Sequence, residues 1–221
     1  VTEDGQTMAA TASSPRELYE VYARPFEAAI RLAGLGSVMA SYAEFEGVPI
    51  HVSHEVLTTL LRGRMGFTGT VVSDYVGVGW AQTRQLVAST PEEVGTLALA
   101  AGMDVELPMV HGYGQVLVKA VQSGKVTEPQ LNEAVRRVLR DKFALGLFDN
   151  PYVAEDPIRL ERLATEGRDL SQRLAAESVT LLKNDKGLLP LSRDAKRIAV
   201  IGPHADSVLV GFAAYTYPAA L

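Results

Sequence analysis

Three short apolar runs, each ending in polar residues, recur along the first half of the chain. They cover residues 37–42, 70–75 and 103–107, and their starts lie 33 residues apart. A helical pattern of apolar residues separates each run from the next. Strands that alternate with helices at this spacing are typical of successive βα units, so the pattern predicts a parallel sheet in an α/β fold.

Three predicted helices begin at hydroxyl residues that are followed three positions later by Glu or Gln. These capping-box patterns start at Ser14, Thr90 and Thr127. Thr127 opens an amphipathic helix with one apolar face, which Gly146 is expected to end. Pro25 lies inside the first helix, where a proline should kink or split it.

The character of the chain changes after Gly146. Proline steps at 149–151 and 156–157 predict a linker, and a helical segment is expected around residues 169–177. The apolar run 197–203 is interpreted as the first strand of a new sheet, buried on both faces. Three βα units are too few to close an eight-stranded barrel, which takes about 250 residues. We therefore expect the sequence to be the late part of one domain and the early part of another.

The composition is ordinary for a globular protein and argues against several classes of partner. Of the 221 residues, 47% are hydrophobic and 21% charged, and the net charge of −5 includes no basic block, which argues against nucleic-acid binding. No apolar stretch approaches the ~18 residues of a membrane span, so no membrane partner is expected. Without cysteine there are no disulfides or thiolate metal sites. No signal-peptide pattern is visible, and the sequence is compatible with a cytoplasmic, periplasmic or secreted protein.

The polar residues that end the three runs are the candidates for chemistry, because catalytic groups of parallel α/β folds collect at the carboxyl ends of strands. They are Ser41, Tyr42 and Glu44, then Ser73, Asp74 and Tyr75, and finally Glu106. Asp74 stands out because it follows an all-apolar strand and has glycines on both sides. From the pattern alone it is either a catalytic carboxylate or a residue that caps a turn.

Two other polar pairs have structural interpretations. Asp104 and Glu106 share a strand face, and a hydrogen-bond network beneath the site is favoured over a catalytic pair. His51 and His54 lie three residues apart at a helix start. No third ligand is near them, so capping or surface placement is favoured over a metal pair.

The remaining motifs carry weak signals. His111 and His204 are isolated, and the glycine pair at 77–79 lacks a phosphate-binding context. The aromatic run 215–217 is interpreted as core or strand rather than as a stacking platform.

The segment GFTGTVVSDY, residues 66–75, closely resembles the nucleophile motif of glycoside hydrolase family 3, the β-glucosidase and β-xylosidase family, written G-F-x-G-x-V-x-S-D-W. Residues 38–62 resemble the preceding strand and helix of the family, and AGMDVELP resembles its A-G-x-D-x-x-M-P. Residues 136–153 resemble the closing helix of its barrel, and residues 175–206 the start of its second domain. The resemblance runs in order over essentially the whole chain.

The resemblance implies roles for individual residues. Asp74 matches the catalytic nucleophile, which forms a covalent glycosyl-enzyme. Tyr42 matches a tyrosine that hydrogen-bonds near the nucleophile, and Met39 matches an apolar wall of the sugar pocket. Tyr75 replaces the usual tryptophan, which stacks on the sugar beyond the cleaved bond, and it offers less stacking area.

The chain departs from the family pattern at two further positions, since Ala43 and Glu46 stand where asparagine is common. The small residues Ser73 and Gly77 are expected to leave room for sugar beside the nucleophile.

The resemblance also implies a fold and a division of the chain. The expected parts are the C-terminal part of a (β/α)8 TIM-like barrel at 1–147, a linker and helix at 148–195, and the start of an α/β sandwich domain at 196–221. The family's acid/base is usually a glutamate of the second domain, beyond Leu221. The remainder of the same polypeptide is therefore an expected partner.

The function that the resemblance implies is a retaining, exo-acting β-glycosidase of the β-glucosidase type. Its substrate would be a β-linked oligosaccharide or an aryl glycoside, and the reaction uses no cofactor and no metal. Two alternatives stay open: a β-xylosidase of the same family, and a non-catalytic carbohydrate-binding protein on the same fold. A β-N-acetylglucosaminidase fits less well, because some of those enzymes consist of the barrel alone.

Overall fold

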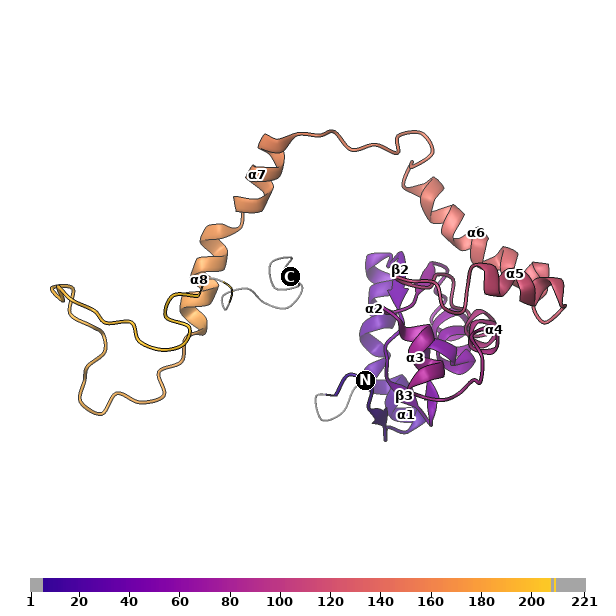
Figure 1. The fold of residues 1–221 in the computed structure, drawn as a ribbon, viewed down its shortest axis with the longest axis horizontal. Coiled ribbons are helices and arrows are strands. Elements are labelled where there is room, and N and C mark those ends of the chain that lie inside the picture. Colours follow the sequence, from indigo (N-terminus) through magenta and orange to yellow (C-terminus); the bar gives the residue numbers. More distant parts are fainter. Residues whose placement is uncertain (1–5, 208, 210–221) are drawn as a thin grey trace. The chain divides into compact units, whose positions relative to one another are not determined.

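The computed structural model describes residues 6–207 and residue 209 (Figure 1). The chain divides into two compact units, Val1–Val153 and Ala154–Leu221, and each is described by itself. The first unit mixes helices and strands, which confirms the predicted α/β class. In the part of the chain that the structure describes, no helix is both long and apolar enough to cross a bilayer.

The first unit alternates helices with short strands. Its elements in chain order are β1 (Ala10–Thr11), α1 (Pro15–Glu17), the π-helical η1 (Leu18–Tyr22), α2 (Arg24–Ala33), β2 (Ser37–Met39), β3 (Glu44–Phe45), β4 (Val48–Pro49), the 3-10 helix η2 (Ile50–Val52), the π-helical η3 (Glu55–Arg64), β5 (Thr70–Val72), α3 (Gly77–Thr83), α4 (Pro91–Ala101), α5 (Gln115–Gln122) and α6 (Glu128–Ala144).

The predicted helix starts are confirmed at all three hydroxyl residues. Ser14 and Thr90 each accept a hydrogen bond at 3.2 Å from the N–H three residues later, and Thr127 forms a complete capping box with Gln130. Pro25 splits the first helix as expected. It lies in the first turn of α2, where its missing N–H removes no helical hydrogen bond.

Two of the three predicted strands pair in parallel. In the ladder between β2 and β5, Val38 lies opposite Val71, and η3 forms the crossover that a parallel pair requires. The third strand prediction, at 103–107, is wrong: the segment keeps only an isolated parallel bridge between Val72 and Val105. The reason is local, because the N–H groups of Asp104 and Val105 both donate to the Val71 carbonyl, a bulge-like pairing that interrupts a ladder.

A second, smaller sheet has the order β1-β3-β4, with β1 parallel and β4 antiparallel to β3. The two-residue turn between β3 and β4 consists of Glu46 and Gly47, with φ of 51° and 76°, as a type I′ hairpin turn requires. No pattern in the sequence indicated this hairpin beforehand. It leads directly into η2, which carries His51.

The core of the first unit lies between the parallel strand pair and the surrounding helices. Its larger members are Leu57, Leu60, Leu61, Phe67, Val71, Val78, Val94, Leu99, Met103 and Leu117. The predicted apolar face of α6 lines a hollow of about 270 Å³ together with Leu99 and Val105. Of that face only Ala134 is buried.

The second unit carries α7 (Pro157–Thr165) and α8 (Arg168–Ser178) in its described part. The helical segment expected around 169–177 is confirmed by α8. Within the predicted linker and helix region, Asp156 caps α7 by accepting the Arg159 N–H at 3.0 Å. An Asp-Pro step favours a helix start as well as a turn, and here the helix start prevails.

The predicted strand at 197–203 is also wrong. The described residues of the second unit form no strand, and Val200 and Ile201 are 72% and 90% exposed. A strand needs a hydrogen-bonded neighbour, and the described part of this unit supplies none. The aromatic run 215–217 lies outside the described residues.

Candidate active site

Asp74 stands at the carboxyl end of β5, two residues beyond the end of the strand, and is half-buried. Its carboxylate oxygen Oδ1 accepts the Tyr75 N–H at 2.7 Å, and its main-chain carbonyl accepts the Gly77 N–H at 3.0 Å. These contacts lead the chain from β5 into α3. The carboxylate is thus oriented by its own turn at the end of a central parallel strand.

The main chain around Asp74 is held by hydrogen bonds at every step from Ser73 to Gly77. The acceptors of the five successive N–H groups are the Val105 carbonyl, His51 Nε2, Asp74 Oδ1, the Leu107 carbonyl and the Asp74 carbonyl. Val76 adopts the left-handed conformation, with φ of 57°, which is rare for a β-branched residue. The course of the backbone is therefore fixed, at the expense of local strain.

His51 is fully buried beneath this turn, so its expected capping or surface placement is wrong. The hydrogen bond in which Nε2 accepts the Asp74 N–H at 3.1 Å requires a neutral ring with its proton on Nδ1, a buried atom without a hydrogen-bond partner among the described residues. Burial lowers the pKa of His51 from its ordinary value to about 4, and the Asp74 charge opposes this effect. The available sequence signal was the apolar setting of His51, between Ile50 and Val52.

The two small residues beside Asp74, Ser73 and Gly77, both contact other segments of the protein. A Cβ on Gly77 would lie 2.0 Å from His51 Nε2, so Gly77 makes room for the imidazole. Ser73 is buried, and its Oγ accepts the Leu107 N–H at 2.8 Å. Ser73 and Gly77 therefore both help to fix the main chain of the Asp74 turn.

Tyr42 lies next to the nucleophile candidate. Its hydroxyl donates to the Tyr75 carbonyl at 2.6 Å, and its ring centroid lies 4.7 Å from that of Trp80. The Arg84 guanidinium lies 4.0 Å from the centroid of the Trp80 ring. The Tyr42, Trp80 and Arg84 side chains are therefore in contact in this order, and Tyr42 connects them to the Asp74 turn.

Tyr75 and Met39, the other two candidates, are exposed to 58% and 57%. Tyr75 directly follows Asp74 in the chain, and its main-chain N–H is bound to the Asp74 carboxylate. Met39 is the last residue of β2, opposite Val72, and it lines an apolar hollow of about 140 Å³ with residues such as Phe26 and Ile50.

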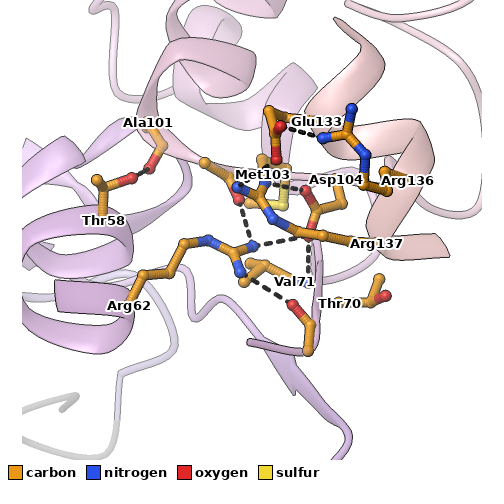
Figure 2. Close-up of polar contacts among 12 residues, drawn as sticks. Thr58, Arg62, Thr70, Val71, Ala101, Met103, Asp104, Glu133, Arg136 and Arg137 are labelled. Carbon is orange, nitrogen blue, oxygen red and sulfur yellow. Dashed lines mark hydrogen bonds and ion pairs between the residues drawn. The ribbon is translucent and has the colours of Figure 1, made fainter. Parts of the chain in front are cut away.

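Asp104 belongs to a buried ion-pair network, shown in Figure 2. Its Oδ2 accepts Arg62 Nη2 at 2.7 Å and the Val71 N–H at 2.8 Å, and its Oδ1 accepts Arg137 Nη1 at 2.8 Å. The Arg62 guanidinium also donates to the Gly69 and Gly102 carbonyls. Burial lowers the pKa of Arg62, and the Asp104 charge opposes this effect. Asp104 thus joins η3, β5 and α6, and sequence reasoning did not identify either arginine.

Glu106 holds the loop that follows it. Its carboxylate accepts the N–H groups of His111, Gly112 and Tyr113 at 2.9–3.1 Å and is buried. With Asp104 in ion pairs and Glu106 on backbone amides, the network interpretation of this pair is confirmed.

The other sequence candidates make local contacts. Ser41 accepts the Ala43 N–H, and Glu44 accepts the Gln85 amide at 3.1 Å. His54 and His204 are exposed, and His111 Nε2 lies 2.7 Å from Gln82 Oε1. Among residues 6–207 and 209, no cluster of three or more His, Cys, Asp or Glu side chains could hold a metal ion.

The fold and the site together define an α/β protein with a candidate catalytic carboxylate at the carboxyl end of a parallel strand. Comparison with known families specifies the class. The glycosyl hydrolase family 3 N terminal domain matches residues 1–140, and the glycosyl hydrolase family 3 C-terminal domain matches residues 179–219. The chain belongs to glycosyl hydrolase family 3.

Individual relatives are similar over most of this chain. A β-xylosidase of Formosa agariphila is 37% identical over 199 residues, which are 87% of this chain and 28% of the relative. A β-glucosidase structure from Erythrobacter marinus matches with a TM-score of 0.74 at 38% identity, over 86% of this chain and 25% of that one. A Listeria innocua β-glucosidase in complex with glucose matches with a TM-score of 0.71 at 34% identity, over 83% of this chain and 25% of that one. The chain spans about a quarter of the length of these relatives.

Proposed function

We propose that the whole protein is a retaining, exo-acting β-glycosidase of the β-glucosidase type, which hydrolyses terminal non-reducing β-D-glucosyl residues. The observation that carries this proposal is the Asp74 carboxylate at the end of β5, within a segment that matches the N-terminal domain of family 3. The two similar structures described above are β-glucosidases, one of them in complex with glucose, which supports a glucoside substrate.

In this proposal Asp74 attacks the anomeric carbon. One carboxylate oxygen is held by the Tyr75 N–H, and the other attacks, so that a covalent glycosyl-enzyme forms and the aglycone leaves. A general acid, which retention places about 5–5.5 Å from the nucleophile, protonates the departing oxygen and then activates water. We assign that acid to the remainder of the polypeptide, and neither Glu106 nor Glu177 is proposed for it.

The proposed architecture follows the same reasoning. Residues 1–147 would form the C-terminal part of a (β/α)8 barrel, residues 148–195 a linker and helix, and residues 196–221 the start of an α/β sandwich. The parallel pairing of β2 with β5 supports the barrel assignment. The match of the C-terminal family domain to residues 179–219 supports a second domain in this region.

Tyr42, Tyr75 and Met39 are proposed to bind the substrate. Tyr42 supports the nucleophile segment through the Tyr75 carbonyl, and the exposed Tyr75 ring would stack on the sugar beyond the cleaved bond. Met39 would form an apolar wall of the sugar pocket.

A β-xylosidase is the second candidate, favoured by the 37% identity to the Formosa agariphila β-xylosidase. A carbohydrate-binding protein without activity is the third.

Hydrolysis of aryl β-glucoside and aryl β-xyloside by the full protein separates the three candidate functions. We expect a higher kcat/KM for the glucoside, and the first sugar released should be the β-anomer in proton NMR, because a covalent intermediate requires two inversions. Initial release of the α-anomer would contradict the mechanism, and hydrolysis of neither substrate would favour the binding protein.

Tyr75→Trp is expected to restore the stacking area that the family's tryptophan offers. Stacking on an aromatic ring contributes about 0.5–1.5 kcal/mol in all, and the tyrosine already supplies part of it, so KM for a β-linked oligosaccharide should fall by up to about fivefold. KM for an aryl monosaccharide should change less, because it offers no second sugar. The ratio of the two KM values is the measurement, with Tyr75→Phe as the control that keeps the ring size. An equal change for both substrates would place Tyr75 outside the proposed subsite.

A further inference from the structure

The N–H of Asp74 is hydrogen-bonded by a side chain from a distant part of the sequence. Its acceptor is Nε2 of His51, 23 residues earlier, at 3.1 Å. The other N–H groups of the turn donate to main-chain carbonyls or to Asp74 itself. His51 is therefore the only side chain from another element that holds an N–H of this turn in the described part of the chain.

The imidazole is packed so that it has one position. The side chain is fully buried, and the space that a Cβ at Gly77 would need is occupied by the ring. The Tyr42 ring lies 5.8 Å from the imidazole, centroid to centroid. Tyr42 in turn holds the Tyr75 carbonyl at 2.6 Å. The peptide group before Asp74 and the peptide group after Tyr75 are thus each held by a side chain, and the rings of these two side chains are neighbours.

We propose that His51 is a positioning residue for the nucleophile: its neutral imidazole accepts the Asp74 N–H and so fixes the main chain from which the carboxylate projects. This role rests on the proposed function of Asp74. The low pKa of His51 keeps the imidazole neutral at ordinary pH, so that Nε2 stays an acceptor. A ring without that acceptor leaves the N–H unpaired, and the peptide group can then rotate and carry the carboxylate with it.

A pair of substitutions separates positioning from packing. His51→Phe keeps a ring of similar size and removes the acceptor, whereas His51→Gln keeps an acceptor, Oε1, near the place of Nε2. His54→Phe is the matched control, since His54 is exposed and lies three residues further along the chain. All three are made in the full protein, and thermal unfolding of each is recorded.

The measured quantity is the rate at which the Asp74 carboxylate attacks the sugar. 2,4-Dinitrophenyl 2-deoxy-2-fluoro-β-D-glucoside transfers its sugar to the nucleophile and releases dinitrophenolate, whose absorbance reports the rate of attack. His51→Phe is expected to slow this step about 10- to 100-fold, because small misplacement of a reacting group has effects of this size. KM for an aryl β-glucoside should stay close to the wild-type value, while kcat falls. His51→Gln should recover most of the rate, and His54→Phe should match the wild type.

Three outcomes would overturn the proposal. An unchanged rate in His51→Phe would show that the hydrogen bond does not position the carboxylate. If His51→Phe and His51→Gln slow the reaction equally and lower the unfolding temperature equally, His51 contributes through packing alone. If His51→Phe does not fold, His51→Leu takes its place in this comparison. If the fluoro-sugar labels another carboxylate of the wild-type protein, the nucleophile assignment and the role of His51 are both wrong. If it labels Asp74 and one of the first two outcomes is found, only the role of His51 is wrong and the proposed function stands.

Discussion

Replacing Asp74 with asparagine in the full protein is expected to lower kcat for an aryl β-glucoside by at least about 10³-fold, equivalent to ~4 kcal/mol of transition-state stabilisation. The amide keeps the shape of the carboxylate but cannot form a glycosyl ester. Its Oδ1 can still accept the Tyr75 N–H, so the unfolding temperature should change little. The measurements are steady-state kinetics and thermal unfolding of the same preparations.

Covalent labelling identifies the residue directly. After reaction with the fluoro-sugar, mass spectrometry of digested wild-type protein should find the sugar on a peptide that contains Asp74, and Asp74→Asn should carry no label. Asp149→Asn is a suitable control, because Asp149 is an exposed carboxylate of the same chain. Full turnover in Asp74→Asn would refute the assignment.

The second large effect concerns stability. Asp104→Asn should lower the free energy of unfolding by about 3–5 kcal/mol, because it leaves two guanidinium groups without their buried counter-charge. The Asp104 side chain is 0% exposed, and the side chains of Arg62 and Arg137 are 11% and 23% exposed. Denaturant unfolding of the full protein measures the change.

An exposed ion pair with the same arginine provides the control. Glu133 lies 3.9 Å from Arg137 and is 54% exposed, so Glu133→Gln should cost less than about 1 kcal/mol. Replacing Asp104, Arg62 and Arg137 together with apolar residues of similar volume should recover much of the stability lost in Asp104→Asn, because no unpaired charge is then buried. A loss below about 1 kcal/mol in Asp104→Asn would show that the network contributes only as surface pairs do.

Local patterns predicted much of the first unit. The helix caps at Ser14, Thr90 and Thr127 depend on residues within one turn, and the structure has them where the sequence indicates. The apolar runs of β2 and β5 also predicted these strands correctly, and they placed Asp74 at the end of a strand. The third run failed as a strand because two neighbouring amides share the Val71 carbonyl, a detail that apolar periodicity does not encode.

The supporting groups of the site could not be predicted, because they depend on contacts between distant segments. His51 reaches Asp74 only after the β3–β4 hairpin has turned the chain, and an isolated histidine in the sequence is more often at a cap or on the surface. Arg62 and Arg137 meet at Asp104 from helices 75 residues apart in the sequence, so neither shows a local signal. The run at 197–203 has the composition of a strand, but the described residues of its unit include no other strand with which it could pair.

The left-handed conformation of Val76, two residues after Asp74, affects which substitutions residues 76 and 77 tolerate. Val76 holds a conformation that costs about 1–3 kcal/mol for a non-glycine residue, and glycine there would relieve that cost. Gly77 is constrained by space instead, since even a methyl group would collide with the His51 imidazole. In a saturation library of this stretch, both positions would therefore select for glycine, position 76 because of its backbone conformation and position 77 because of the space that His51 occupies.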